Sequence, residues 1–92
     1  MSEALNGAAA RIRPGQVVRS LAGRDSGRML LTLRVEENYA WVADGSLRPI
    51  ERPKKKKLRH LGATKRTVEE PVGSDRELRR LLARLETDEE EE

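Results

Sequence analysis

At 92 residues, the chain has room for one small domain with tails, and a two-domain organisation is excluded. It contains no Cys and one His, which excludes disulfides, thiolate metal sites and a cysteine nucleophile, and we expect neither a cofactor nor a metal. Residues through Arg66 carry 15 Lys or Arg and 6 Asp or Glu, whereas the remaining residues carry 4 and 10, so the net charge of +3 conceals a basic body and an acidic tail. This arrangement is typical of proteins that bind polyanions, although it also favours solubility.

The first part of the chain predicts short strands. Residues 1–13 show no usable periodicity, and we expect them to be disordered up to the turn signal Pro14-Gly15. Between 14 and 62, runs of apolar residues alternate with turn signals and predict strands over 16–21, 28–35, 39–43, 46–50 and 58–61. Short strands at such close spacing predict a mainly β fold, in which the sheet closes into a small barrel over 14–62.

The second predicted strand has the clearest alternation. One of its faces is apolar and consists of Met29, Leu31, Leu33 and Val35. The opposite face is partly basic, with Arg28 and Arg34 at its two ends. A strand of this kind places one side on a core and the other in solvent.

The end of the chain predicts a helix. Residues 63–73 are expected to form a linker, and Ser74 with Glu77 forms a capping box that begins a helical segment over 74–87. One face of this amphipathic helix carries Leu78, Leu81, Leu82 and Leu85. That face either packs on the barrel, which we favour, or docks on a partner helix or groove. The acidic run 88–92 is unfavourable at a helix C-terminus and should fray into solvent.

Basic residues gather in the loop 22–27 and in the stretch 48–60. In the loop, Asp25 lies between Arg24 and Arg28, where it can fix one guanidinium group while the other meets a phosphate. Four consecutive lysines in the later stretch form either a nucleic-acid patch or a solvated loop, and His60 is either a phosphate or base contact or an ordinary strand residue. The candidate RNA-binding residues are Arg19, Arg24, Asp25, Arg28, Arg48, Lys54, Lys55, Lys56, Lys57, Arg59 and His60.

Other classes of function find little support in the sequence. The carboxylates show no spacing that would place a buried acid beside a base, and no phosphate-cradling loop is present, so we expect no enzyme and no small-molecule substrate. The only aromatic residues are Tyr39 and Trp41, and their strand could place either of them in the core. We therefore favour contacts to the phosphate backbone of folded RNA over stacking on single strands.

Two segments resemble a known family. Residues 15–35, GQVVRSLAGRDSGRMLLTLRV, resemble a KOW motif, with Gly27 at the position of the key glycine between two strands. Residues 43–61, ADGSLRPIERPKKKKLRHL, resemble bacterial KOW-domain RNA-binding proteins akin to large-subunit ribosomal proteins of archaea and eukaryotes. The resemblance covers about half the chain and implies an SH3-like barrel that binds RNA.

The resemblance also defines the expected setting of the protein. It implies a ribosome-associated protein that acts in translation on structured RNA, with ribosomal RNA as the expected target and ribosomal or transcription proteins as further partners. The longest strongly apolar run, 29–31, is far too short to cross a membrane, and we expect a cytoplasmic protein. The alternative is a protein-interaction adaptor in transcription or translation that uses the leucine face of the C-terminal helix.

Overall fold

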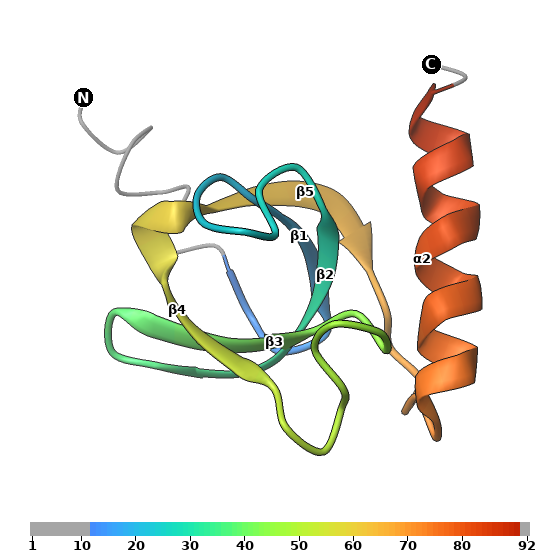
Figure 1. Cartoon of the computed structure of the whole chain (residues 1–92), viewed down its shortest axis with the longest axis horizontal. Helices are drawn as coiled ribbons and strands as arrows, with labels where there is room; N and C mark the ends of the chain where they lie inside the picture. Colours follow the sequence, from blue (N-terminus) through green and yellow to red (C-terminus); the bar gives the residue numbers. More distant parts are fainter. Residues whose placement is uncertain (1–11, 91–92) are drawn as a thin grey trace.

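The computed structural model describes residues 12–90, with side chains described through 87. Within this range the fold is mainly β, with a five-stranded antiparallel sheet and one C-terminal helix (Figure 1). The elements are β1 (Gln16–Ser20), β2 (Met29–Glu36), β3 (Tyr39–Ala43), β4 (Lys54–Lys57), the 3-10 turn η1 (Leu58–His60), β5 (Leu61–Thr67) and α2 (Asp75–Glu90). Within these residues, no helix is long and apolar enough to cross a membrane.

The sheet has the strand order β4-β3-β2-β1-β5 and curls strongly, so that the short turn η1 connects its two edge strands (Figure 1). The concave side holds one apolar cluster, formed by Ile12, Val18, Leu30, Ala40, Val42, Leu58 and Leu61. The opposite side holds a second cluster, in which Val17, Met29, Leu31 and Ala43 pack against Leu78 and Leu82 of α2. The first strands therefore bury both faces, which explains their nearly continuous apolar sequence.

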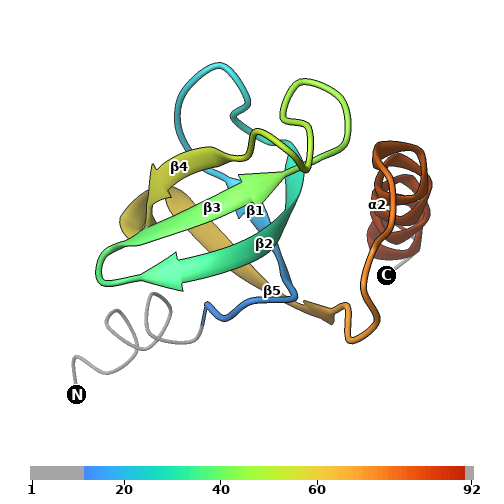
Figure 2. The same ribbon diagram turned by 90° about the horizontal axis from the view of Figure 1, so that it is seen from below.

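Helix α2 begins where the capping box predicts. The hydroxyl of Ser74 accepts a hydrogen bond from the N–H of Glu77 at 3.1 Å, which satisfies one free donor of the first helical turn. Leu78 is completely buried and Leu82 nearly so, while Leu81 and Leu85 are half-buried. Leu78, Leu82 and Leu85 of the leucine face thus belong to the cluster between α2 and the sheet, and Figure 2 shows α2 beside the sheet. Of the two roles predicted for this face, packing within the chain is the one observed for Leu78 and Leu82, and it enlarges a small core.

The N-terminus of α2 also holds the loop 44–53. A carboxylate oxygen of Asp75 accepts a hydrogen bond from the N–H of Ile50 at 2.8 Å, and Arg79 donates one to the carbonyl oxygen of Gly45 at 2.7 Å. Gly45 has a φ of 80°, and a Cβ there would collide with the carbonyl oxygen of Asp75. Glycine is needed at this position both for the turn and for the close approach of the helix.

Three of the predicted strands are present, and the predictions of strands over 46–50 and 58–61 are wrong, apart from Leu61, which begins β5. The segment 46–50 is a loop, because the Asp44 carboxylate accepts hydrogen bonds from the N–H groups of Ser46 and Arg48 and closes a turn there. The lysine run is itself β4, and the segment 58–60 is a 3-10 turn. The last strand, β5, takes in the first part of the predicted linker, residues 63–67, since pairing with β1 compensates for its weak apolar pattern.

The register of β2 changes partway along the strand. A β-bulge lies between Thr32 and Arg34, so residues beyond it point to the opposite face from the one that the alternation predicts. Met29, Leu31 and Leu33 face α2 as a group, but Val35 packs against the concave cluster. The bulge also places Arg34 opposite Trp41 on the outer face.

Both ends of the described chain depart from the predicted boundaries. Ile12 is 3% exposed and belongs to the concave cluster, so the order begins before residue 14. Helix α2 continues through Glu90 instead of ending at 87, because its backbone hydrogen bonds persist into the acidic run. The remainder of the predicted disordered segment and the last two acidic residues lie outside the described range.

Candidate nucleic-acid interface

A buried ion pair connects the loop 21–28 to β4. The Asp25 carboxylate is 1% exposed, and its Oδ1 accepts hydrogen bonds from the Lys56 ammonium group at 2.9 Å and from the Ser20 hydroxyl at 2.8 Å. Lys56 donates a further hydrogen bond to the carbonyl oxygen of Ala22 at 2.9 Å. Because Lys56 pairs with Ala40, whose side chain belongs to the concave cluster, the register of β4 points Lys56 inward.

The charged state of Asp25 is favoured in this setting. Burial alone raises the pKa of the Asp25 carboxyl, but the hydrogen bonds from Lys56 and Ser20 and the positive charge of Lys56 outweigh it and hold that pKa below 3.8. The second carboxylate oxygen lies 3.7 Å from Nε of Arg48, and neither of these two atoms has a hydrogen-bond partner among the described residues. The Asp25 carboxylate therefore lies next to two cations, Lys56 of β4 and Arg48 of the loop 44–53.

A second ion pair joins the loops 21–28 and 44–53, which rise side by side from the same end of the sheet (Figure 2). Arg28 lies 3.3 Å from the carboxylate of Asp44, which is itself buried. The contact between Arg48 and Asp25 runs in the opposite sense, so each loop supplies one arginine to a carboxylate of the other loop. The prediction that Asp25 fixes a neighbouring guanidinium is therefore wrong, since Lys56 and Arg48 occupy it and Arg28 pairs with Asp44.

Several predicted RNA-binding residues are engaged within the protein. Asp25 and Lys56 are buried against each other and unavailable to a ligand. Arg19 pairs with Glu86 of α2 at 3.2 Å and donates a hydrogen bond to the carbonyl oxygen of Gly27 at 2.6 Å. The carbonyl oxygen of half-buried His60 accepts a hydrogen bond from the N–H of Leu21 at 2.8 Å, a contact that does not involve the imidazole ring. The side chains of Arg19, Asp25 and Lys56 thus make contacts within the protein that hold the loop 21–28 in place.

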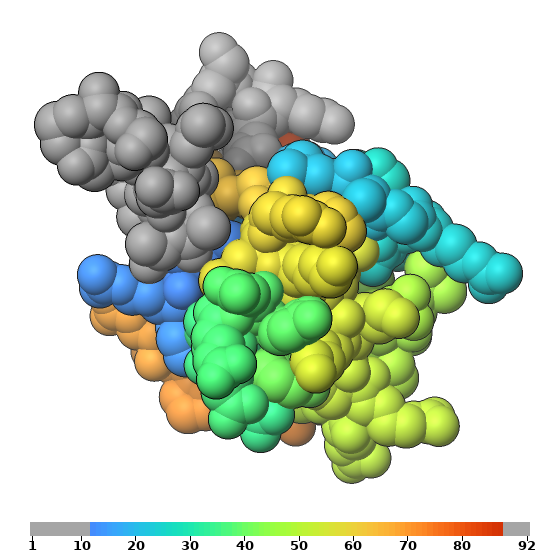
Figure 3. All heavy atoms as spheres, turned by 90° about the vertical axis from the view of Figure 1, so that its left-hand side faces the viewer, coloured from blue at the N-terminus to red at the C-terminus, as the bar shows by residue number. Residues whose placement is uncertain are grey.

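The other predicted cations are accessible, some of them while paired. We call basic face the exposed cations of the loop 21–28, the loop 44–53, β4 and η1. Its members are Arg24, Arg28, Arg52, Lys54, Lys55, Lys57 and Arg59, to which the half-buried Arg48 adds its guanidinium group. Figure 3 shows β4 and η1 in yellow at the centre of one side of the molecule, bordered by the two loops and by the green β2–β3 hairpin.

The outer surface of β2, β3 and β4 also carries both aromatic residues, for which no stacking role is expected from the sequence. The Arg34 guanidinium group lies 3.9 Å from the centroid of the Trp41 ring, and the Lys55 ammonium group lies 4.3 Å from that of Tyr39. Such contacts are attractive because the face of an aromatic ring is electronegative. The alternation of Tyr39 and Trp41 with small Ala40 and Val42 was the available signal, since the latter two face the concave cluster.

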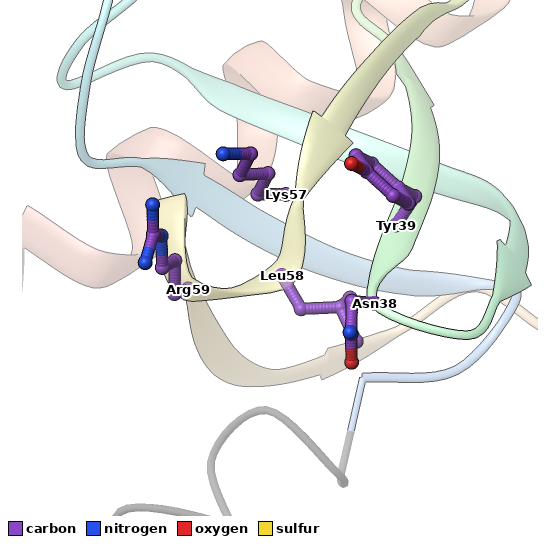
Figure 4. Close-up of a pocket in the computed structure, with 5 residues that line it drawn as sticks. All are labelled: Asn38, Tyr39, Lys57, Leu58 and Arg59. Atoms are coloured by element: carbon purple, nitrogen blue, oxygen red, sulfur yellow. The ribbon is translucent and has the colours of Figure 1, made fainter.

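One end of this surface is hollowed into a pocket of about 350 Å³ (Figure 4). The described residues that line it come from the β2–β3 turn, β3, β4 and η1; they are Asn38, Tyr39, Lys57, Leu58 and Arg59. Figure 4 shows the Tyr39 ring reaching from β3 towards β4, while Lys57 and Arg59 carry their nitrogen atoms away from the ring. The pocket thus combines an aromatic and aliphatic wall with two cations.

Metal ligands and similarity to known proteins are two further guides to the function of such a surface. Among the residues whose side chains are described, no three His, Asp or Glu residues are arranged to hold a metal ion. Comparison with protein-family models and with curated proteins gives no significant match. The arguments about function therefore rest on the basic face, the pocket and the chemistry of their residues.

Proposed function

We propose that this chain is a KOW-type RNA-binding protein with an SH3-like barrel, and that its basic face binds structured RNA such as ribosomal RNA. The observation that carries the proposal is the set of accessible cations on four elements, of which β4 and η1 lie together on one side of the molecule with the two loops beside them (Figure 3). Phosphate contacts of this kind supply affinity by releasing condensed counterions from RNA. The choice of ribosomal RNA rests on the resemblance of residues 15–35 and 43–61 to KOW-domain proteins.

The arrangement beneath the basic face supports the same proposal. The two loops are held in place by Asp25 and Asp44, whose charges are taken up inside the protein by Lys56, Arg48 and Arg28. Arg28 and Arg48, which remain partly accessible while they are fixed in this way, lose less side-chain entropy when they bind a phosphate. The barrel assignment is supported by the strong curl of the sheet, by the 3-10 turn between its edge strands and by the apolar cluster on its concave side.

The first test replaces the three outward lysines of β4 and leaves Lys56 intact. A Lys54→Gln, Lys55→Gln, Lys57→Gln variant should bind ribosomal RNA more weakly, and the slope of log affinity against log salt should flatten by about two units, since each phosphate contact contributes about 0.7 to 0.9. The matched control is Arg76→Gln, Arg80→Gln, Arg84→Gln, which removes the same charge from exposed positions of α2.

The control should keep the slope of the unmodified protein. Equal losses in the two variants would show that overall charge, and not the basic face, determines binding. Absence of salt-dependent RNA binding by the unmodified protein would overturn the proposed function. Cosedimentation of the full chain with ribosomal subunits tests the ribosomal assignment, and its absence under conditions where purified RNA is bound would overturn that part alone.

A further inference from the structure

We propose that the pocket between the β2–β3 turn and η1 receives the base of one unpaired nucleotide, with its flanking phosphates on Lys57 and Arg59. This inference rests on the proposed function, because it specifies which part of an RNA the protein recognises. Recognition of a base differs from binding to the RNA phosphate backbone, because a pocket that accepts one base distinguishes bulges and loops from a continuous RNA helix.

The walls of the pocket are fixed relative to each other. The N–H of Leu58 donates a hydrogen bond to the carbonyl oxygen of Asn38 at 2.8 Å, which joins η1 to the β2–β3 turn. Tyr39 pairs across the sheet with Lys57, and the buried Leu58 side chain anchors the start of η1 in the concave cluster. A pocket whose walls are held by strand pairing and by a core residue is largely formed before a ligand arrives.

The lining chemistry matches the parts of a nucleotide. The Tyr39 ring and the small exposed part of Leu58 present a mainly apolar wall. The Lys55 ammonium group lies 4.3 Å from the centroid of that ring, so a base that stacks on Tyr39 takes the other face of the ring or displaces Lys55. The side-chain amide of Asn38 offers both donors and an acceptor to the edge of that base. Lys57 and Arg59 are exposed cations for the phosphates, and no carboxylate is among the described lining residues.

The size of the pocket limits the ligand. About 350 Å³ lies at the small end of the usual range for ligand pockets, which is about 300 to 1,000 Å³. One ring system fits such a volume better than a stacked pair does. In a continuous A-form helix the bases are stacked and paired, so only a base that has left the helix can enter. The surrounding lysines of the basic face would meanwhile contact the phosphates of the adjoining helix.

The test compares two RNA duplexes of equal length that differ at one position. In the first, a 2-aminopurine nucleotide is bulged out; in the second, the same nucleotide is paired with uridine. The full chain should bind the bulged duplex about tenfold more tightly, as expected from stacking of one base, and should change the fluorescence of the bulged 2-aminopurine. Tyr39→Leu should abolish this preference and leave the salt slope unchanged, whereas Tyr39→Phe should retain both.

Trp41→Leu is the matched control, because it removes the other aromatic ring from the same strand and the same outer face, outside the pocket. It should keep the preference for the bulged duplex. If circular dichroism shows that Tyr39→Leu does not fold, Asn38→Ala replaces it, because Asn38 is exposed and its removal should not affect folding. In Asn38→Ala, duplexes that differ only in which of the four nucleotides is bulged should bind with equal affinity.

The possible failures are distinguishable. Equal affinity of the unmodified protein for both duplexes would overturn the nucleotide pocket and leave the proposed function standing. Binding to neither duplex would overturn the proposed function itself. A polyglutamate peptide that suppresses the 2-aminopurine response and binds as tightly as the bulged duplex would show that the pocket takes an acidic peptide chain instead.

Discussion

The ammonium group of Lys56 lies 2.9 Å from Oδ1 of Asp25, and both side chains are almost completely shielded from solvent. The two residues are 31 positions apart and belong to β4 and to the loop 21–28. One member of the lysine run therefore holds a loop in place, while its neighbours Lys55 and Lys57 face outward. A strand alternates its side chains between two faces, so consecutive lysines acquire different roles.

Lys56→Gln should destabilise the protein by about 3 kcal/mol, because it leaves the buried Asp25 carboxylate without its main counter-charge. Urea unfolding at neutral pH measures the effect. Lys57→Gln, which removes the same charge from an exposed neighbour, should change the free energy of unfolding by less than about 0.5 kcal/mol. Similar effects of the two substitutions would contradict the buried ion pair.

Acid should weaken the fold through Asp25. Its pKa in the folded protein lies below 3.8, so its contribution to the free energy of unfolding is complete above that pH and is lost as the pH falls through the lowered value. Unfolding in urea at a series of pH values on both sides of 3.8 measures this dependence. Asp25→Asn should be less stable at neutral pH but lose less stability in acid, whereas Glu51→Gln, at an exposed carboxylate, should keep the acid dependence of the parent.

Gly45→Ala should destabilise the protein more than Gly27→Ala. Gly27 has a φ of 89° and open space around the position of a Cβ, so the cost is that of the left-handed backbone alone, about 1 to 2 kcal/mol. Gly45 has the same backbone requirement and also lies against Asp75 of α2, which adds about 1 to 3 kcal/mol of overpacking. Thermal melting of both variants checks the order. A larger loss at Gly27 would show that α2 does not press on the loop in solution.

Leu78→Ala should cost about 2 to 5 kcal/mol, since this side chain is completely buried between α2 and the sheet. Leu81→Ala, at a half-buried position of the same helix, should cost less than about 1 kcal/mol. Chemical denaturation provides the comparison. An unchanged free energy of unfolding in Leu78→Ala would contradict the packing of α2 on the sheet and would favour a leucine face that is free to dock on a partner.

The sequence by itself determined the elements whose signals are local. The alternation over 28–35, the apolar run after Pro14-Gly15 and the strand before Asp44-Gly45 all correspond to observed strands. The capping pair Ser74 and Glu77 located the start of α2 to within one residue, because N-capping depends on side chains within one turn of the helix. The clustering of basic residues in two stretches of the chain was equally visible, since it requires only counting.

Only the tertiary structure decided which residues are buried and which are exposed within those elements. Strand β5 exists because β1 offers it hydrogen bonds, and its own sequence contains a single large apolar residue, Leu61. The bulge in β2 sent Val35 inward and Arg34 outward, and the register of β4 buried Lys56. Each outcome depends on pairing between segments distant in sequence, and a shift of one residue in such pairing moves a side chain to the opposite face of the sheet.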